Sequence, residues 1–415
     1  MKKAIIVGLN KSVDNDFYLD ELIDLAKALD IEVKLVVTQN LDHPNNAYYV
    51  GKGKAEEIDL NAKSIEADYV IFDDELSPTQ VRNLSNIIET KIIDRTDLIL
   101  MIFEKRASSR LSQIQVEIAK LKYELPRLIG SNDNLSRQGG SSGAYSKGAG
   151  ETQLELDRRR IANKISSLKR ELNKIIKTRE TERGLRYKNK VKIVALAGYT
   201  NAGKSSIMNA LLKMTKAKDD KEVFEKNQLF ATLDTSSRRI KLPNNREFIL
   251  IDTIGFISKL PHHLIDAFNS TLEDIKNADL IIHVVDISNP DYQTQIDVTN
   301  STFEYLQIQD SKEIITVFNK IDKTFVNKND DSIYISAKKG DGLDDLIKII
   351  DQKLFDLAYC ELLIPYNDGK LYSYLKENTE IIKEEFLDSH IEIHCFLSTK
   401  DYNKYQKYIK NSLVS

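Results

Sequence analysis

The segment from Lys192 to Leu212 constrains the fold of this 415-residue chain more than any other. An apolar stretch at residues 192–197 runs into Gly198-Tyr199-Thr200-Asn201-Ala202-Gly203-Lys204-Ser205, and a helical pattern follows over residues 206–212. This spacing is typical of a phosphate-binding loop between a strand and a helix, where backbone N–H groups and a helix N-terminus converge on phosphate oxygens. Strand and helix patterns alternate up to about Asp356, which predicts an α/β domain over residues 190–356.

The loop residues are expected to bind both a nucleotide and Mg²⁺. Lys204 is predicted to reach the β- and γ-phosphates and to act in catalysis, and Ser205 to hold Mg²⁺. Two interpretations of Asn201 remain open: a ligand for a monovalent cation such as K⁺ beside the phosphates, or an asparagine that braces the backbone. The residues of this segment predicted to bind nucleotide are Gly198, Tyr199, Thr200, Asn201, Ala202, Gly203, Lys204, Ser205 and Ser206.

A second motif follows an apolar run at residues 248–251 and consists of Asp252-Thr253-Ile254-Gly255. Asp252 is expected to bind Mg²⁺ through water, while the Gly255 N–H reaches the γ-phosphate and contributes to catalysis. The four-residue pattern is uninformative alone, but here it follows a phosphate-binding loop in the expected order. All four residues, Asp252, Thr253, Ile254 and Gly255, are predicted to line the nucleotide.

A third motif points to guanine. Asn319-Lys320-Ile321-Asp322 follows a β-rich stretch, and the Asp322 carboxylate can accept from the N1–H and the exocyclic amine of guanine together. Adenine offers no such pair of donors. Asn319 is expected either to bond the base edge or to brace the phosphate-binding loop. The residues predicted to contact the base are Asn319, Lys320, Asp322, Ser336, Ala337 and Lys338. The three motifs in this order predict a GTP-binding domain.

Thr232, in Phe230-Ala231-Thr232-Leu233-Asp234, is the best candidate for a switch threonine that completes Mg²⁺ coordination and acts in catalysis when the γ-phosphate is present. Its alternative is an ordinary loop threonine. Phe230 and Ala231 are predicted to lie beside the nucleotide with it. Phe256 stands where many GTPases have a water-orienting glutamine, so the attacking water must be oriented by another group. His262 and His263 are assigned surface or packing roles.

The remaining regions predict three further parts. Residues 1–103 alternate strand and helix patterns and are expected to form a parallel-sheet α/β domain. Residues 104–189 carry two runs of heptad spacing around the loop 130–150, which holds six Gly and five Ser, so an antiparallel coiled-coil hairpin is expected, its first helix kinked or ended at Pro126. Residues 357–415 predict a small α+β domain in the order strand, helix, two strands, helix. The heptad positions are Leu111, Ile114, Ile118, Leu121, Leu125 and Leu128, then Leu154, Ile161, Ile165, Leu168, Leu172 and Ile175.

Composition limits the location and the partners of the chain. The longest apolar runs, such as residues 98–103, have six residues, so no transmembrane helix or stable membrane insertion is expected. Two cysteines and the lack of a signal-peptide cleavage site predict a cytoplasmic protein. The net charge of −3 hides a basic segment, because residues 151–192 hold 14 Lys+Arg and 6 Asp+Glu, which indicates an element that faces a polyanion.

The chain resembles the HflX GTPases over nearly its whole length. The resemblance rests on residues 49–58, on Phe72-Asp73-Asp74-Glu75-Leu76-Ser77-Pro78, on Asp94-Arg95-Thr96-Asp97-Leu98 and on Gly150-Glu151-Thr152-Gln153-Leu154. It implies an N-terminal domain, a coiled-coil linker, a GTPase domain and a small C-terminal domain. It also implies binding to the large ribosomal subunit and its rRNA, and splitting or rescue of stalled or idle ribosomes in the GTP form. We expect a monomer whose slow GTP hydrolysis is stimulated by the ribosome.

Several basic residues are candidates for rRNA contacts, and each has an alternative. Lys52 and Lys54, in a Gly-Lys-Gly-Lys stretch, could contact an RNA backbone, form part of a second nucleotide site or lie in a solvated turn. The Arg158, Arg159 and Arg160 triplet could contact RNA or be a solvated helix face. Arg137 and Lys147, in the predicted tip loop, complete the candidates.

Two other functions remain open at this stage. One is a regulatory GTPase switch that acts on a protein partner through the basic hairpin. The other is ATP-dependent RNA remodelling by the N-terminal domain. Salt-sensitive cosedimentation with ribosomal subunits tests the first alternative, and ATP binding by residues 1–103 tests the second.

Overall fold

The computed structural model describes residues 1–10, 15–131, 147–188, 191–215, 230, 235–242, 246–308, 312–325, 332–355, 357–379 and 381–413. The chain forms two compact units. The first comprises Met1–Leu185, Lys226–Asp234 and Ile254–Leu272, and the second comprises Arg186–Glu225, Thr235–Thr253 and Glu273–Ser415. The first unit therefore takes Ile254–Leu272 from within the sequence predicted as the GTPase domain.

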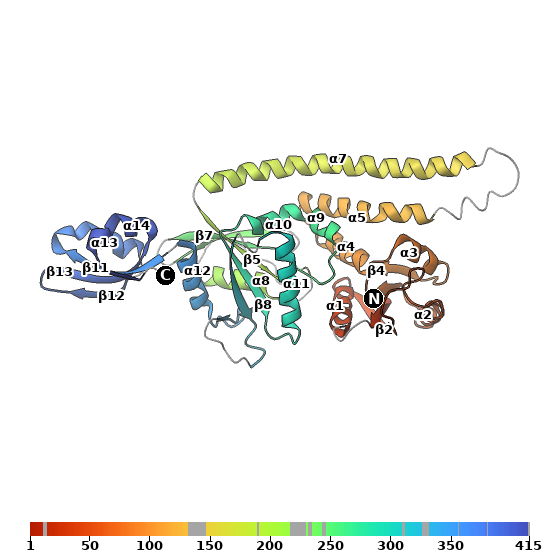
Figure 1. The fold of residues 1–415 in the computed structure, drawn as a ribbon, viewed down its shortest axis with the longest axis horizontal. Helices are drawn as coiled ribbons and strands as arrows, with labels where there is room; N and C mark the ends of the chain where they lie inside the picture. The colour runs from red at the N-terminus through yellow and green to blue at the C-terminus, as the bar shows by residue number, and fades with distance from the viewer. Residues whose placement is uncertain are drawn as a thin grey trace. The chain divides into compact units, whose positions relative to one another are not determined.

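The first unit contains a four-stranded sheet, of which Figure 1 labels strands β2 and β4. Every pair of neighbouring strands in this sheet is parallel. Its strand order is β2-β1-β3-β4, which is the α/β organisation that the sequence pattern predicts. The strands are β1 (Lys2–Asn10), β2 (Ile31–Asn40), β3 (Tyr69–Phe72) and β4 (Lys91–Asp94). The helices that alternate with them are α1 (Asn15–Ala28), α2 (Lys52–Ile65), α3 (Pro78–Ser85) and α4 (Arg95–Arg106).

Alternation along β1 supplies a core on each face of this sheet. Ala4 and Ile6 belong to one buried cluster, whereas Ile5 and Val7 belong to another, as the two-residue period of a strand requires. Local signals fix the helix starts. Ser77 forms a capping box with Gln80 at α3, and the carboxylate of Asp94, at the end of β4, accepts from the backbone N–H of Asp97 to cap α4.

Helices α5 (Arg110–Ser131) and α7 (Lys147–Lys188) carry the two heptad runs. Arg110 pairs with Glu171 at 2.7 Å and Glu117 with Lys164 at 2.6 Å, so the two helices run antiparallel. Helix α5 continues through Pro126 and does not end there. Lys147, assigned to the loop by the sequence, is the first residue of α7. The residues that pack between the helices are Ile114, Ile118, Leu121, Ile165, Leu168, Leu172 and Ile175.

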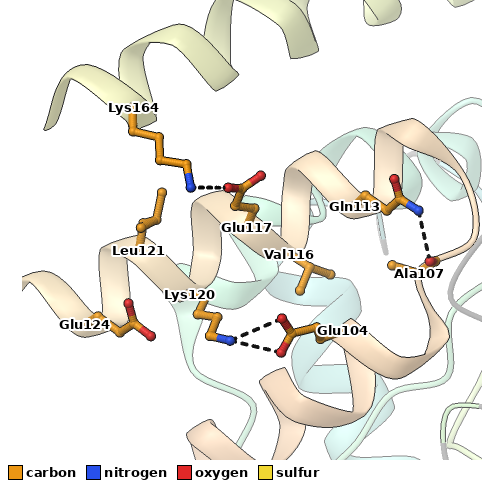
Figure 2. Close-up of a pocket in the computed structure, with 9 residues that line it drawn as sticks. All are labelled: Glu104, Ala107, Gln113, Val116, Glu117, Lys120, Leu121, Glu124 and Lys164. Carbon is orange, nitrogen blue, oxygen red and sulfur yellow. Dashed lines mark hydrogen bonds and ion pairs between the residues drawn. The ribbon is translucent and has the colours of Figure 1, made fainter. Parts of the chain in front are cut away.

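Helix α5 also packs against α4 within the first unit (Figure 2). Lys120 of α5 pairs with Glu104 of α4 at 2.9 Å, and Glu117 reaches across to Lys164 of α7. These pairs border a pocket whose apolar lining includes Val116 and Leu121. Such exposed pairs add little stability individually, so the buried heptad residues are what hold the helices together.

The second unit begins with a six-stranded sheet of order β10-β9-β8-β5-β7-β6, in which only β6 is antiparallel to its neighbour among the described strands. The strands are β5 (Lys192–Gly198), β6 (Ser236–Lys241), β7 (Glu247–Asp252), β8 (Leu280–Asp286), β9 (Glu313–Asn319) and β10 (Ile333–Tyr334). The helices that follow strands of this sheet are α8 (Lys204–Met214), α11 (Tyr292–Tyr305) and α12 (Leu343–Phe355). Helix α9 (His262–Ala267) belongs to the first unit, and α10 (Asn269–Lys276) starts there and ends in the second.

The last part of the second unit is an antiparallel sheet of order β12-β13-β11-β14. Its elements are β11 (Leu357–Pro365), a 3-10 turn (Tyr366–Asp368), α13 (Gly369–Asn378), β12 (Ile381–Phe386), β13 (His390–Ser398), α14 (Thr399–Tyr405), a second turn (Gln406–Tyr408) and β14 (Ile409–Leu413). The sequence pattern lacks β14, because this short edge strand contains Lys410, Asn411 and Ser412 and has no clear apolar alternation.

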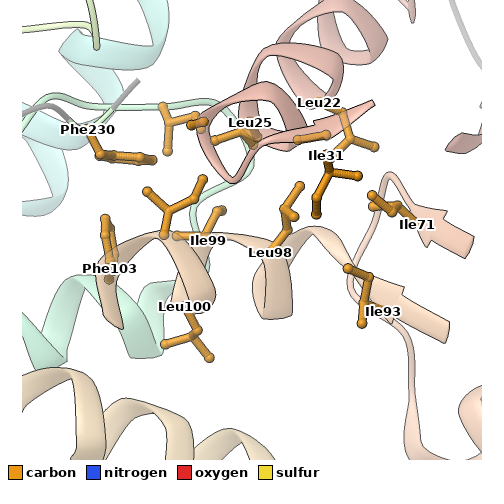
Figure 3. Packing of buried hydrophobic residues seen from close by; sticks show 14 of the residues in the cluster. Leu22, Leu25, Ile31, Ile71, Ile93, Leu98, Ile99, Leu100, Phe103 and Phe230 are labelled. Atoms are coloured by element: carbon orange, nitrogen blue, oxygen red, sulfur yellow. The ribbon is translucent and has the colours of Figure 1, made fainter. Parts of the chain in front are cut away.

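Three aromatic rings pack together in the buried core of the first unit, and Figure 3 labels two of them, Phe103 and Phe230. The ring of Phe103, on α4, lies 4.7 Å from that of Phe230 and 4.8 Å from that of Phe268, edge to face in both pairs. All three side chains are buried. Phe230 and Phe268 come from the two later segments of the first unit, so Phe103 joins α4 to both of them.

We predict that Phe103→Ala lowers the free energy of unfolding of the first unit by about 3–5 kcal/mol, since the change leaves a cavity where three rings meet. Urea unfolding followed by circular dichroism measures the loss, and amide hydrogen exchange in β1 and β3 assigns the transition to this unit. Leu60→Ala is the matched control because Leu60 is 68% exposed, and its effect is expected to stay within about 0.5 kcal/mol. Equal effects of the two substitutions would contradict the role given to Phe103.

Candidate nucleotide-binding site

The phosphate-binding loop of the second unit depends on two glycines with positive φ. Gly198 has φ 144°, and a Cβ there would lie 2.3 Å from the backbone oxygen of Val284 in β8. Gly203 has φ 98°, and a Cβ there would lie 2.3 Å from Nδ2 of Asn319. Any larger residue would therefore both strain the backbone and displace a neighbour. The loop is held between the ends of β5, β8 and β9.

Lys204 occupies the centre of the loop. Its ammonium group is buried and donates to the backbone oxygens of Gly198 at 3.0 Å and Tyr199 at 2.8 Å. Burial lowers the pKa of Lys204 to about 8, against the attraction of Asp252, because a charged group is poorly solvated there. A phosphate group near this nitrogen would stabilise the charged form.

Asp252 and Ser205 provide oxygen atoms suited to a magnesium ion. Asp252 ends β7 and is completely buried, and the Ser205 hydroxyl donates to its carboxylate at 2.6 Å. Next to it, the Thr253 hydroxyl donates to the backbone oxygen of Leu196 at 2.7 Å, which fixes the end of β7 against β5. Hydroxyl and carboxylate oxygens are the ligands that Mg²⁺ prefers, so these residues fit the ion that the sequence predicts.

Asn319 joins the phosphate-binding loop to the base-recognition residues. Its Nδ2 donates to the backbone oxygen of Ala202 at 2.9 Å, and its Oδ1 accepts from the backbone N–H of Ala337 at 3.1 Å. Asn319 is 2% exposed. Of the two roles left open by the sequence, the contact present here is the one that braces the loop.

The other base-recognition residues lie around Asn319. Asp322 accepts from the Ser336 hydroxyl at 2.7 Å, and this hydrogen bond lowers the pKa of Asp322 and keeps it ionised. Lys320 donates to the backbone oxygen of Asn201 at 2.6 Å and pairs with Asp286 at 2.6 Å. Asp286 is not among the residues predicted from the sequence, although its position as an acidic residue at the end of β8 is a usable signal.

Comparisons of the sequence with known proteins find relatives that match nearly the whole chain. The chain is 42% identical over 411 residues to GTPase HflX of Caldanaerobacter subterraneus subsp. tengcongensis, covering 98% of this chain and 94% of that protein. It is 37% identical over 396 residues to GTPase HflX of Escherichia coli strain K12, covering 92% and 90% of the two chains. The chain belongs to the HflX family of GTPases. The resemblance proposed from the motifs is thereby confirmed.

Family models cover most of the chain in three consecutive parts. A GTP-binding GTPase N-terminal model matches residues 16–104, a GTP-binding GTPase middle-region model matches 106–186, and a 50S ribosome-binding GTPase model matches 193–320. Among solved structures, a GTP-binding protein from the archaeon Sulfolobus solfataricus in complex with GDP is 25% identical, with a TM-score of 0.43. The match covers 85% of this chain and 99% of that chain.

The Asp-x-x-Gly motif of this HflX protein crosses from one unit to the other. Asp252 and Thr253 belong to the second unit, whereas Ile254 and Gly255 belong to the first. Phe256, in place of a glutamine, is 3% exposed and is a buried residue of the first unit. Ala231 and Thr232 lie outside the described residues, and the ring of Phe230 lies in the aromatic cluster with Phe103. His263 is half-buried beside Tyr123 and Arg127.

The candidate RNA-binding residues are placed on helices of the first unit. Lys52 and Lys54 lie in the first turn of α2, where Lys54 pairs with Glu57 at 2.9 Å and Lys52 lies 4.0 Å from Glu56. Arg158, Arg159 and Arg160 are exposed on α7, two of them within 3.4 Å of acidic side chains one turn earlier. Arg137 lies outside the described residues. None of the helices that the structure describes is both long and apolar enough to cross a membrane.

We predict that the affinity for GDP decreases as pH rises through about 8. Phosphate binding requires charged Lys204, and the charged fraction in the nucleotide-free protein decreases above its pKa of about 8. Between pH 7.5 and 8.8 the dissociation constant should rise about fivefold. Calorimetric titration in two buffers with different ionisation enthalpies should show proton uptake near pH 8.8 and almost none at pH 7. Binding without proton uptake at pH 8.8 would refute this role of Lys204.

Proposed function

We propose that this protein binds GTP with Mg²⁺ and hydrolyses it to GDP and phosphate. The observation that carries the proposal is the double contact of Asn319, which fixes the phosphate-binding loop to the segment of Ser336 and Ala337 in one buried arrangement. The distance between the phosphate-binding loop and the base-recognition residues is thereby fixed. Family membership supports the same activity.

The proposed roles of Lys204, Ser205 and Asp252 rest on the groups described above, and the role of Thr232, which lies outside the described residues, rests on its sequence motif. Lys204 neutralises the β- and γ-phosphates, and the oxygens of Ser205 and Asp252 hold Mg²⁺, Asp252 through water. When bound, the ion neutralises charge that develops on the transferred phosphate. Thr232 and the Gly255 N–H complete the site around the γ-phosphate. Phe256 cannot orient water, so intrinsic hydrolysis is slow and partner binding accelerates it. Whether Asn201 assists through K⁺ is tested by exchanging K⁺ for Na⁺ at constant ionic strength.

We further propose that the large ribosomal subunit is the partner and that GTP binding favours splitting or rescue of stalled ribosomes. The family model for residues 193–320 describes a 50S ribosome-binding GTPase, and the exposed arginines of α7 offer phosphate contacts. In this proposal residues 1–103 bind ribosomal RNA, residues 104–189 form the coiled-coil hairpin with its tip at 130–150, residues 190–356 hydrolyse GTP and residues 357–415 form a small domain. The protein acts as a monomer in the cytoplasm.

We predict that Asp322→Asn weakens GTP binding by about two orders of magnitude and favours xanthosine triphosphate. The amide places a donor where guanine needs an acceptor, and xanthine carries an oxygen at that position. Titration with fluorescent analogues of both nucleotides measures the change. Lys339→Ala serves as a control, because it removes an exposed charge that acts on Asp322 without removing the acceptor. Unchanged GTP affinity in Asp322→Asn would remove Asp322 from base recognition.

We predict that replacing Arg158, Arg159 and Arg160 with Ala weakens cosedimentation with large ribosomal subunits. The slope of log affinity against log salt should become less steep by about one for each arginine that contacts a phosphate. The matched control replaces three other exposed cations of α7, Lys169, Arg170 and Lys174, with Ala. Equal losses of ribosome binding in the two triple variants would indicate a general charge effect. If the wild-type chain binds a protein partner but not ribosomes, the alternative of a regulatory GTPase switch is favoured.

A further inference from the structure

The segment that follows the Asp-x-x-Gly motif is attached to the N-terminal sheet by Lys259. The Lys259 ammonium group donates to the carboxylate of Asp73 and to that of Asp74 at 2.8 Å, and it lies 4.6 Å from the centre of the Tyr18 ring. All these groups belong to the first unit. Two carboxylates and an aromatic face together form a binding site for a cation, and the chain's own lysine occupies it.

Ser258 makes a second attachment beside the first. Its hydroxyl donates to the Glu21 carboxylate, and Arg95 donates to the same hydroxyl at 3.3 Å. Arg95 is 1% exposed and also pairs with Glu21 at 2.6 Å and with Asp73. Although burial alone would lower the pKa of Arg95, the charges of Asp73 and Glu21 raise it above its usual value. The buried guanidinium group of Arg95 therefore binds both Glu21 and Asp73, the carboxylates that accept from Ser258 and Lys259.

These attachments lie at the position where sheets of this kind bind ligands. The strand order β2-β1-β3-β4 reverses direction between β1 and β3, and ligands of open α/β sheets bind outside the carboxyl ends of the strands at that point. Asp73 and Asp74 directly follow β3, and Tyr18 and Glu21 lie on α1, which follows β1. The segment with Ser258 and Lys259 thus binds at the edge of the N-terminal sheet where open α/β sheets bind ligands.

The backbone at Lys259 shows that the attachment determines a conformation. Lys259 has φ 51°, in the left-handed region that a lysine rarely adopts without external constraint. Apolar anchors on both sides, Ile257 and Leu264, are buried in the same core as α1 and α4. Polar attachments and apolar anchors together hold the segment that begins three residues after Gly255.

We propose that Lys259 is a positioning residue: held by Asp73 and Asp74, it sets the conformation of the segment after Gly255 and so the preference of the protein for GTP over GDP. This inference rests on the proposed function. Linkage makes the effect reciprocal, because a γ-phosphate that favours one conformation of the segment must change the strength of the attachment by the same factor. The N-terminal domain then contributes to nucleotide selectivity without contributing a nucleotide ligand.

The test compares the ratio of dissociation constants for GDP and a nonhydrolysable GTP analogue. Lys259→Met and Asp74→Asn should each shift this ratio at least threefold in the same direction, and the double variant should shift it no further than the larger single change. Asparagine keeps an acceptor for Tyr49, which donates to Asp74 at 2.8 Å. Lys259→Arg keeps the charge and should stay near the wild-type ratio. If both single variants keep the wild-type ratio, or if their effects add fully, the proposal is wrong.

A second measurement separates positioning from a merely structural role. In the nucleotide-free protein, amides of Ser258, Lys259 and Leu260 should exchange hydrogen at least tenfold faster in Lys259→Met than in the wild type. The matched control is Lys105→Met, which breaks an exposed ion pair in the same unit, that of Lys105 with Asp30 at 2.6 Å. This variant should change neither the nucleotide ratio nor the hydrogen exchange of these amides. Faster exchange with an unchanged nucleotide ratio overturns the proposal. If the wild type does not bind guanine nucleotides, the proposed function is wrong. If hydrogen exchange of these amides is unchanged in Lys259→Met, the attachment does not position the segment, whatever the outcome for nucleotide binding.

Discussion

Thr253 and Ile254 are joined by one peptide bond but are held by different parts of the structure. The Thr253 hydroxyl is fixed to β5 of the second unit, whereas Ile254 is buried in the core that contains α1 and α4. The boundary between the two units therefore lies inside the segment from Asp252 to Gly255. The attachments of Ser258 and Lys259 act on this segment, because they fix the chain shortly after Gly255 to the N-terminal sheet and α1.

Two buried charged groups among the described residues of the first unit, Arg95 and Asp94, each have partners of opposite charge. Removing Arg95 and its carboxylates from water is costly, and such clusters stabilise a fold only when every member has good partners. Arg95 meets Glu21 and Asp73, and Asp94 accepts from Tyr123 and Arg127 of α5 at 2.6 and 2.9 Å. These charges thus join the carboxyl ends of β3 and β4 to α1, α4 and α5 within the first unit.

Much of the nucleotide site could be predicted from the sequence because its chemistry is encoded in short segments with fixed spacing. The glycines at 198 and 203, the lysine and serine after them and the pair Asn319 and Asp322 each follow a recognisable strand. The assignment of Ile254–Leu272 to the first unit could not be predicted in this way. Lys259 and Asp73 are 186 positions apart, and a lysine in a loop gives no sign of its partner. Phe230 was equally ambiguous, since a phenylalanine beside a switch threonine can face a nucleotide or a core.

The length of α7 has a mechanical consequence. Its 42 residues, at about 1.5 Å each, extend about 63 Å, which makes the helix a rigid lever. A rotation of about five degrees at one end displaces the other end by about 5 Å. Adjustments of a few tenths of an ångström near the base of this helix are therefore amplified to several ångströms at its far end.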